Sequence, residues 1–179
     1  METSTDLRYP VGKYEPNPFS ADRKEEWIAD IKFLPNLLEA AISNLDEAQL
    51  QTPYRPGGWT VHQVVHHVAD SHMNAYIRFK LGMTEENPTI KPYEENDWAQ
   101  LEDVRVLPVN ISITLLFALH ERWTVFLKSI TDEDWQRRTV FHPEHQKEMT
   151  LWHLLGMYAW HSRHHTAHVT ALRGRMGWK

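Results

Sequence analysis

Cysteine is absent from this chain of 179 residues, so disulfides, thiolate metal ligands and a catalytic cysteine are all excluded. Basic residues are outnumbered, with 19 Lys and Arg against 24 Asp and Glu, which argues against a nucleic-acid-binding protein. No apolar run approaches the roughly 20 residues that a membrane helix requires. Glycine is scarce, with 7 residues, and this favours helices over a turn-rich β fold. Any bound metal must therefore be held by His, Asp or Glu.

The first six residues, METSTD, have neither the basic start nor the apolar core of a signal peptide. We therefore expect a cytoplasmic protein, and the length suits a single domain spanning residues 1–179. Residues 1–19 contain three prolines and three aromatic residues, which predict an extended arm packed on the body of the protein.

Hydrophobic periodicity predicts four long amphipathic helices. They are expected from Ser20 to about Leu45, from Thr60 to about Gly82, over residues 112–130, and from Thr150 to about Gly174. Residues 83–110 lack periodicity, are acidic and contain three prolines, so they suit a long crossover loop between helix ends. Residues 139–145 predict a brief hairpin or loop. The fold class is therefore all-α, a four-helix bundle.

Histidine is unusually abundant, and nine of the 12 histidines fall within residues 62–72 and 153–168. In the last helix, His161, His165 and His168 occupy consecutive positions of the apolar seam, where Leu or Ile is expected. His161 and His165 are four residues apart, so their imidazoles share one helix face and can converge on a divalent metal. On these residues alone, a metal site is no better supported than a pair of hydrogen-bonded core histidines or a cluster of surface histidines.

A third ligand is expected from the second helix, which offers His66, His67 and His72. Periodicity favours His72, because it lies at the centre of the apolar stripe. The same pattern places His67 at the flank of the stripe and His66 on the outer side.

The stretch GWTVHQVVHHVADS at residues 58–71, followed by HSRHH at residues 161–165, resembles the DinB-like superfamily of metal-binding four-helix bundles. The resemblance is strongest to its YfiT-type metal-dependent hydrolases. It extends to YPVGKY at 9–14, IKPY at 90–93, HPE at 142–144 and RMGW at 175–178. It implies that the metal ligands are His67, His161 and His165, which overrules the preference for His72. It also implies a homodimer, and His168 replaces a glutamine that many relatives carry.

Three neutral imidazoles with one open coordination position are typical of a catalytic zinc site. Water at such a position has a pKa of about 7, so a hydroxide nucleophile is available near neutral pH. We therefore expect a hydrolase of an unknown small molecule with one divalent ion per subunit, zinc first and nickel second. Two alternatives remain: a low-molecular-weight-thiol S-transferase, in which the metal holds a substrate thiolate, and a metal-binding protein with no chemistry of its own.

Residues near the predicted ligands are weaker candidates for the site. Asp70 could orient an imidazole or accept a proton, although a solvated carboxylate is the simpler interpretation. Ser71 and Asn74 share the face of His67 and could line a pocket. Arg78 extends the same face and could bind a carboxylate, although an ordinary surface ion pair is the simpler interpretation. His164 is expected to be a surface or interface residue, and His142 and His145 are expected to be plain loop residues.

Overall fold

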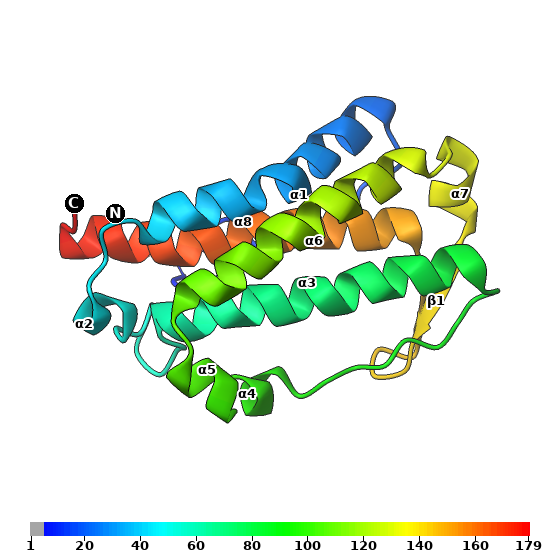
Figure 1. Ribbon diagram of the computed structural model, residues 1–179. Coiled ribbons are helices and arrows are strands. Elements are labelled where there is room, and N and C mark those ends of the chain that lie inside the picture. Colours follow the sequence, from blue (N-terminus) through cyan, green and yellow to red (C-terminus); the bar gives the residue numbers. More distant parts are fainter. Residues whose placement is uncertain (1–5) are drawn as a thin grey trace.

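A computed structural model describes residues 6–179, and its main body is a bundle of four long helices (Figure 1). These are α1 (Ala21–Ile42), α3 (Val61–Thr84), α6 (Val109–Ser129) and α8 (Leu151–Met176). Helices α1 and α3 each pack against both α6 and α8. Figure 1 shows that α3 and α6 run in one direction, and α1 and α8 in the other. The predicted bundle is confirmed.

Side-chain caps fix the start of three of the long helices, as the sequence predicts. The hydroxyl of Thr60 accepts a hydrogen bond from the backbone of Gln63, whose side chain accepts one from the backbone of Thr60. Ser20 and Thr150 cap α1 and α8, because each side chain accepts a hydrogen bond from the backbone N–H three residues later. The third long helix begins at Val109, three residues earlier than predicted, because the chain can turn into it directly after Pro108.

Two of the long helices end two residues later than predicted. Helix α3 passes through Gly82 and ends at Thr84. A Cβ atom at Gly82 would lie 2.7 Å from Leu151 Cδ2, so this glycine permits a close approach of α8. Helix α8 continues beyond Gly174 to Met176, and Gly177 ends it in the left-handed conformation at φ +66°.

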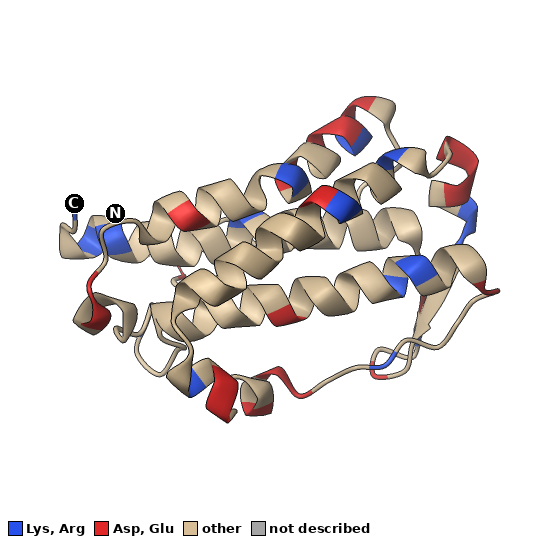
Figure 2. Cartoon of the chain, in the orientation of Figure 1, with Lys and Arg blue, Asp and Glu red and all other residues tan. Residues whose placement is uncertain are grey.

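The predicted crossover spans residues 85–108 and returns the chain from the end of α3 to the start of α6 (Figure 1). It contains the short helices α4 (Glu95–Trp98) and α5 (Glu102–Val106), whose acidic residues are visible in Figure 2. A hairpin of β1 (Thr139–His142) and β2 (Lys147–Thr150) precedes α8. The crossover is attached to this hairpin, because Ile90 N donates to Phe141 O at 3.0 Å. Short helices α2 (Glu47–Leu50) and α7 (Asp132–Arg137) complete the chain.

Residues 6–20 form the described part of the N-terminal arm, which lies antiparallel along α8; residues 1–5 of the predicted arm are outside the described part. His168 Nε2 donates to Arg8 O at 3.2 Å, and Trp160 Nε1 donates to Gly12 O at 3.0 Å. Further along, Tyr14 OH donates to His153 O at 3.2 Å. The arm therefore covers the histidine-rich face of α8.

The core of the bundle consists of two apolar clusters. One surrounds Phe79, Trp123 and Trp135 near the hairpin, and the other surrounds Leu38 and Val65 near the opposite end. Along the helices, His72, His120 and the four histidines of residues 161–168 fall between the residues of these two clusters. No helix within residues 6–179 combines the length and the apolar character needed to span a membrane.

Candidate metal centre

His67, His161 and His165 meet between α3 and α8. One ring nitrogen from each lies within 4.8 Å of the others, and Nε2 of His67 lies 3.3 Å from Nε2 of His161. The four-residue spacing on α8 places the last two on one face, as the sequence predicts. His67 reaches them from the flank of the α3 stripe, which is the position that the family resemblance implies.

The three imidazoles fit a divalent metal. Two nitrogens bound at 2.0–2.1 Å in a tetrahedron lie about 3.3–3.4 Å apart, which agrees with the separation of the two Nε2 atoms. His165 Nδ1 is buried and has no hydrogen-bond partner within the described chain. Burial lowers the pKa of His67 to about 4 and the pKa values of His161 and His165 well below 6.5. The rings are therefore neutral at neutral pH, as metal ligation requires.

Behind His161 lies a chain of buried imidazoles that the sequence did not reveal. His161 Nδ1 is 3.1 Å from His72 Nε2, and His72 Nδ1 is 3.0 Å from His120 Nε2. His120 Nδ1 in turn lies 2.5 Å from the carbonyl oxygen of Ile31. His72 and His120 are 0% and 1% exposed, so each imidazole is shielded from water.

The direction of this chain assigns the proton on each ring. A carbonyl oxygen can only accept, so Nδ1 of neutral His120 carries the proton and its Nε2 accepts from Nδ1 of His72. By the same argument, His72 Nε2 accepts from Nδ1 of His161. Nε2 of His161 is then left with a lone pair, and this is the atom that faces His67. Burial lowers the pKa of His120 to about 4 and that of His72 well below 6.5, so one proton per ring is expected.

The imidazoles lie between two hollows of the surface, and both His67 and His161 line each of them. The first hollow, about 430 Å³ in volume, is also lined by Trp59, Trp160 and Arg55. The second, about 440 Å³, lies toward the hairpin. This second hollow is also lined by Ser71, Arg78, Tyr93, His142 and Tyr158. Glu95 and Asn96 of the crossover border both hollows, so this loop forms a wall of the site.

The two predicted catalytic candidates occupy different places. Ser71 is buried, and its Oγ lies 3.4 Å from His161 Nε2. Asp70 makes no side-chain hydrogen bond to a described imidazole and lines neither hollow. Burial, with a smaller effect of Asp103, raises its pKa to about 6. The structure thus brings Ser71 to the imidazoles but not Asp70, and the side-chain amide of Asn74 donates to the Asp70 backbone carbonyl at 2.9 Å.

Three residues that were expected at the surface, at an interface or in a loop are buried in the structure. His164 is only 7% exposed, because Trp160 stacks on its ring at 4.3 Å and Tyr9 of the arm lies 6.0 Å away. His142 is also only 7% exposed, because its ring stacks on His145 at 4.2 Å inside the second hollow. Arg78 is 8% exposed and forms no surface ion pair among the described residues.

The remaining unassigned histidine of the seam, His168, is buried under Tyr54, whose ring stacks on it at 3.9 Å. His164, His165 and His168 also bring ring nitrogens within 4.8 Å of one another. Because His165 belongs to both groups, this second group lies directly beside the first.

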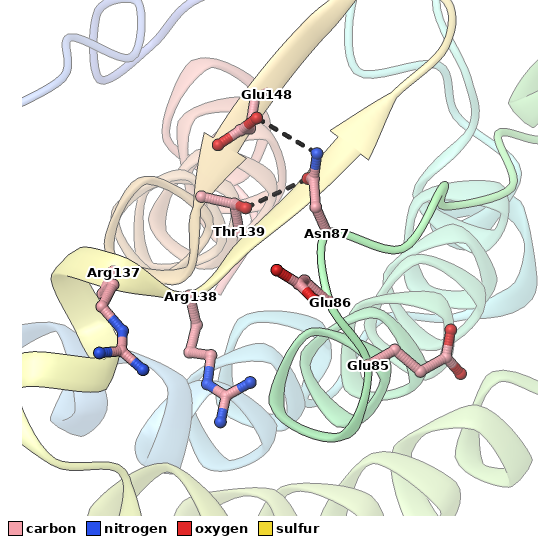
Figure 3. A pocket seen from close by; sticks show the side chains of 7 residues that line it. All are labelled: Glu85, Glu86, Asn87, Arg137, Arg138, Thr139 and Glu148. Carbon is pink, nitrogen blue, oxygen red and sulfur yellow. Dashed lines mark hydrogen bonds between the residues drawn. The ribbon is translucent and has the colours of Figure 1, made fainter.

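A third hollow, about 610 Å³ in volume, lies where α3 meets the hairpin and contains no histidine (Figure 3). Its Asn87 donates to Glu148 at 3.2 Å and accepts from Thr139 at 3.1 Å, so these polar groups bond to one another. This hollow offers no set of convergent unpaired ligands, and the imidazole cluster remains the candidate site.

Comparison with known proteins shows the family of this chain. The sequence matches the DinB superfamily over residues 30–169. Proteins named "Putative metal-dependent hydrolase" from Bacillus cereus (strain B4264) and Bacillus anthracis (strain CDC 684 / NRRL 3495) are 55% and 54% identical over 174 residues. Each match covers 97% of this chain and 99% of the relative.

A solved structure gives the same result. YfiT from Bacillus subtilis, described as "a probable metal-dependent hydrolase with an unusual four-helix bundle topology", matches with a TM-score of 0.93 and 48% sequence identity. The match covers 97% of this chain and 99% of YfiT. The resemblance read from the sequence is confirmed, and this chain belongs to the DinB superfamily.

Proposed function

We propose that this protein is a metal-dependent hydrolase of a small molecule, with one divalent ion held by His67, His161 and His165. The observation that carries the proposal is the 3.3 Å separation of the His67 and His161 Nε2 atoms beside two open hollows. Imidazole ligands suit zinc first and nickel second. A bound divalent ion with three imidazole ligands supplies Lewis acidity and a hydroxide nucleophile near neutral pH.

The chain's own residues hold and orient this site. His72 keeps the proton of His161 on Nδ1, so that Nε2 remains free to ligate. Ser71 Oγ, 3.4 Å from that Nε2, can accept or donate one hydrogen bond to a group in the second hollow. Trp59 packs against His67 with ring centroids 4.5 Å apart, which limits the access of water to one side of the imidazoles.

The test compares purified wild-type protein, loaded with one equivalent of zinc or nickel, with His161→Ala. Small carboxylic esters, amides and phosphate esters serve as substrates, each with and without added cysteine as a thiol. The proposal predicts hydrolysis by metal-loaded wild type alone, without a need for the thiol. Product formation only with the thiol would favour the S-transferase. Equal rates for wild type and His161→Ala would contradict a metal-dependent reaction.

A further inference from the structure

Arg78 lies on the same face of α3 as the proposed ligand His67. The two are eleven residues apart, which is about three helical turns, and both line the second hollow. Tyr158 links the two regions, because Arg78 Nη1 donates to its hydroxyl at 3.0 Å and its ring lies 5.9 Å from that of His161. A small molecule in this hollow can therefore reach the imidazoles at one end and Arg78 at the other.

The guanidinium of Arg78 is buried without a counter-charge. Its two hydrogen bonds go to neutral oxygens, the Tyr158 hydroxyl and the Lys91 carbonyl, each at 3.0 Å. Its Nε has no partner, and no carboxylate of residues 6–179 lies within 4.0 Å of it. Arginine cannot lose its proton, and a buried cation without an anion is costly. The site therefore lacks one negative charge.

His142 of the hairpin also lines this hollow, and it is close enough to Arg78 for that charge to lower its pKa. It is 7% exposed, and its Nδ1 is buried without a hydrogen-bond partner in the described chain. Burial, then His145 and Arg78, lower its pKa, so the ring is neutral at neutral pH and retains one N–H donor. A cation and a neutral donor that line one hollow suit an oxyanion.

The outer edge of the hollow limits which anion is suitable. Glu94, Glu95 and Glu144 line it and are solvent-exposed. Their negative charges repel a dianion such as phosphate more strongly than a singly charged carboxylate. The planar fork of a guanidinium also matches the two oxygens of a carboxylate.

The geometry points to a carboxylate-binding subsite at Arg78 and His142, which holds a carboxylate group of the molecule that the metal centre acts on. The inference rests on the proposed function only in linking this subsite to a substrate. Binding of the carboxylate itself requires no metal.

The test is a titration of the metal-free protein with sodium propionate, followed by NMR of the arginine Nε–H groups and backbone amides. We expect the Arg78 Nε–H resonance of the wild type to shift to saturation, while sodium chloride at the same ionic strength gives no saturable shift. Inorganic phosphate is expected to bind more weakly than propionate. An Arg78 Nε–H chemical shift that changes linearly with propionate concentration, without saturation, would overturn the assignment. Phosphate binding as tight as the binding of propionate would also overturn it.

Variants separate the subsite from a purely structural clamp. Arg78→Met should weaken propionate binding at least about tenfold, measured at the amides of Ser71 and Tyr93. Arg137→Met is the matched control, because Arg137 is exposed and pairs with Glu133 at 3.1 Å. The propionate affinity of this variant should equal that of wild type. Unchanged affinity in a folded Arg78→Met would contradict the proposal. If that variant does not fold, the titration of the wild-type Arg78 Nε–H resonance decides whether propionate binds at Arg78. Propionate binding without any metal-dependent hydrolysis would refute the proposed function and leave the subsite intact.

Discussion

His120 donates its Nδ1–H to the carbonyl oxygen of Ile31, 2.5 Å away, across the α1–α6 interface. That carbonyl is available because the residue four positions later is Pro35, which has no backbone N–H to close the helical hydrogen bond. A proline inside α1 thus provides the acceptor that sets the proton positions on His120, His72 and His161. This series of hydrogen-bonded imidazoles connects the Ile31 carbonyl of α1 to His161, the proposed ligand on α8.

Removal of His120 should weaken metal binding although no ligand is lost. His120→Phe removes the acceptor for His72, so His161 is no longer held in one tautomer. We expect zinc affinity to fall by about 10–100-fold, measured by competition with a chromophoric chelator. In the metal-free protein, ¹⁵N NMR should show a single Nδ1–H tautomer of His161 in wild type and a mixture in the variant.

Two further variants test whether this effect comes from orientation. His120→Gln retains an N–H donor and an oxygen acceptor and should recover part of the affinity. His153→Gln alters a half-buried α8 histidine outside the proposed metal centre and should leave the zinc affinity unchanged. Wild-type affinity in His120→Phe with an unchanged His161 tautomer would show that the chain has no orienting role.

Loss of any single proposed ligand should abolish stoichiometric metal binding. His67→Ala, His161→Ala and His165→Ala each leave two imidazoles, which hold zinc far more weakly than three. Elemental analysis after dialysis, with His153→Ala as the control, measures the outcome. Full retention of metal by one of the three variants would remove that residue from the ligand set.

The sequence predicted the bundle because the information is local: caps at Ser20, Thr60 and Thr150 and apolar residues at helical spacing fix where helices form. The pairing of His161 with His165 is equally local. The rotation of α3 about its own axis cannot be read from the local sequence, because it depends on how α3 packs against α6 and α8. Periodicity therefore favoured His72, which contacts His161 from behind, and only the family resemblance identified His67.

The remaining features depend on contacts between distant segments. His120 follows Leu116 by four residues on the buried face of α6, and this spacing was the one signal that could have revealed it. His164 is buried by Trp160, four residues earlier on α8, and by Tyr9 of the N-terminal arm, and the contact with the arm is not indicated by the local sequence.

The stability of the metal-free protein should fall as the pH is lowered from about 6.5 to 4. Burial lowers the pKa of His67 and His120 to about 4, whereas an unfolded histidine titrates near 6.5. The unfolded chain therefore binds protons in this window that the folded chain does not, and low pH favours unfolding. For His120 this difference corresponds to about 3 kcal/mol of unfolding free energy.

Urea denaturation at a series of pH values measures this dependence. His120→Phe should show a shallower decline than wild type, because one buried titrating group has been removed. A free energy of unfolding that is constant between pH 7 and pH 4 would contradict the assignment of neutral, buried imidazoles.

The glycines of α8 should respond to alanine in opposite directions. A Cβ at Gly156 would lie 2.6 Å from the Trp27 ring and 2.7 Å from the Tyr14 hydroxyl, so Gly156→Ala should destabilise the protein by about 1–3 kcal/mol. Gly174, also within α8, has no atom within 4 Å of the same position, so Gly174→Ala should stabilise it by up to about 1 kcal/mol. Denaturant unfolding of both variants checks the pair; stabilisation by Gly156→Ala would mean that α1 and the arm do not pack closely on α8.

X-ray absorption spectroscopy of the protein loaded with one equivalent of zinc tests the central claim most directly. The structure predicts three histidine nitrogens at about 2.0–2.1 Å and one further light atom supplied by solvent, which added cysteine or azide replaces. A shell of four histidine nitrogens, with no replaceable ligand, would contradict a metal centre open to a substrate.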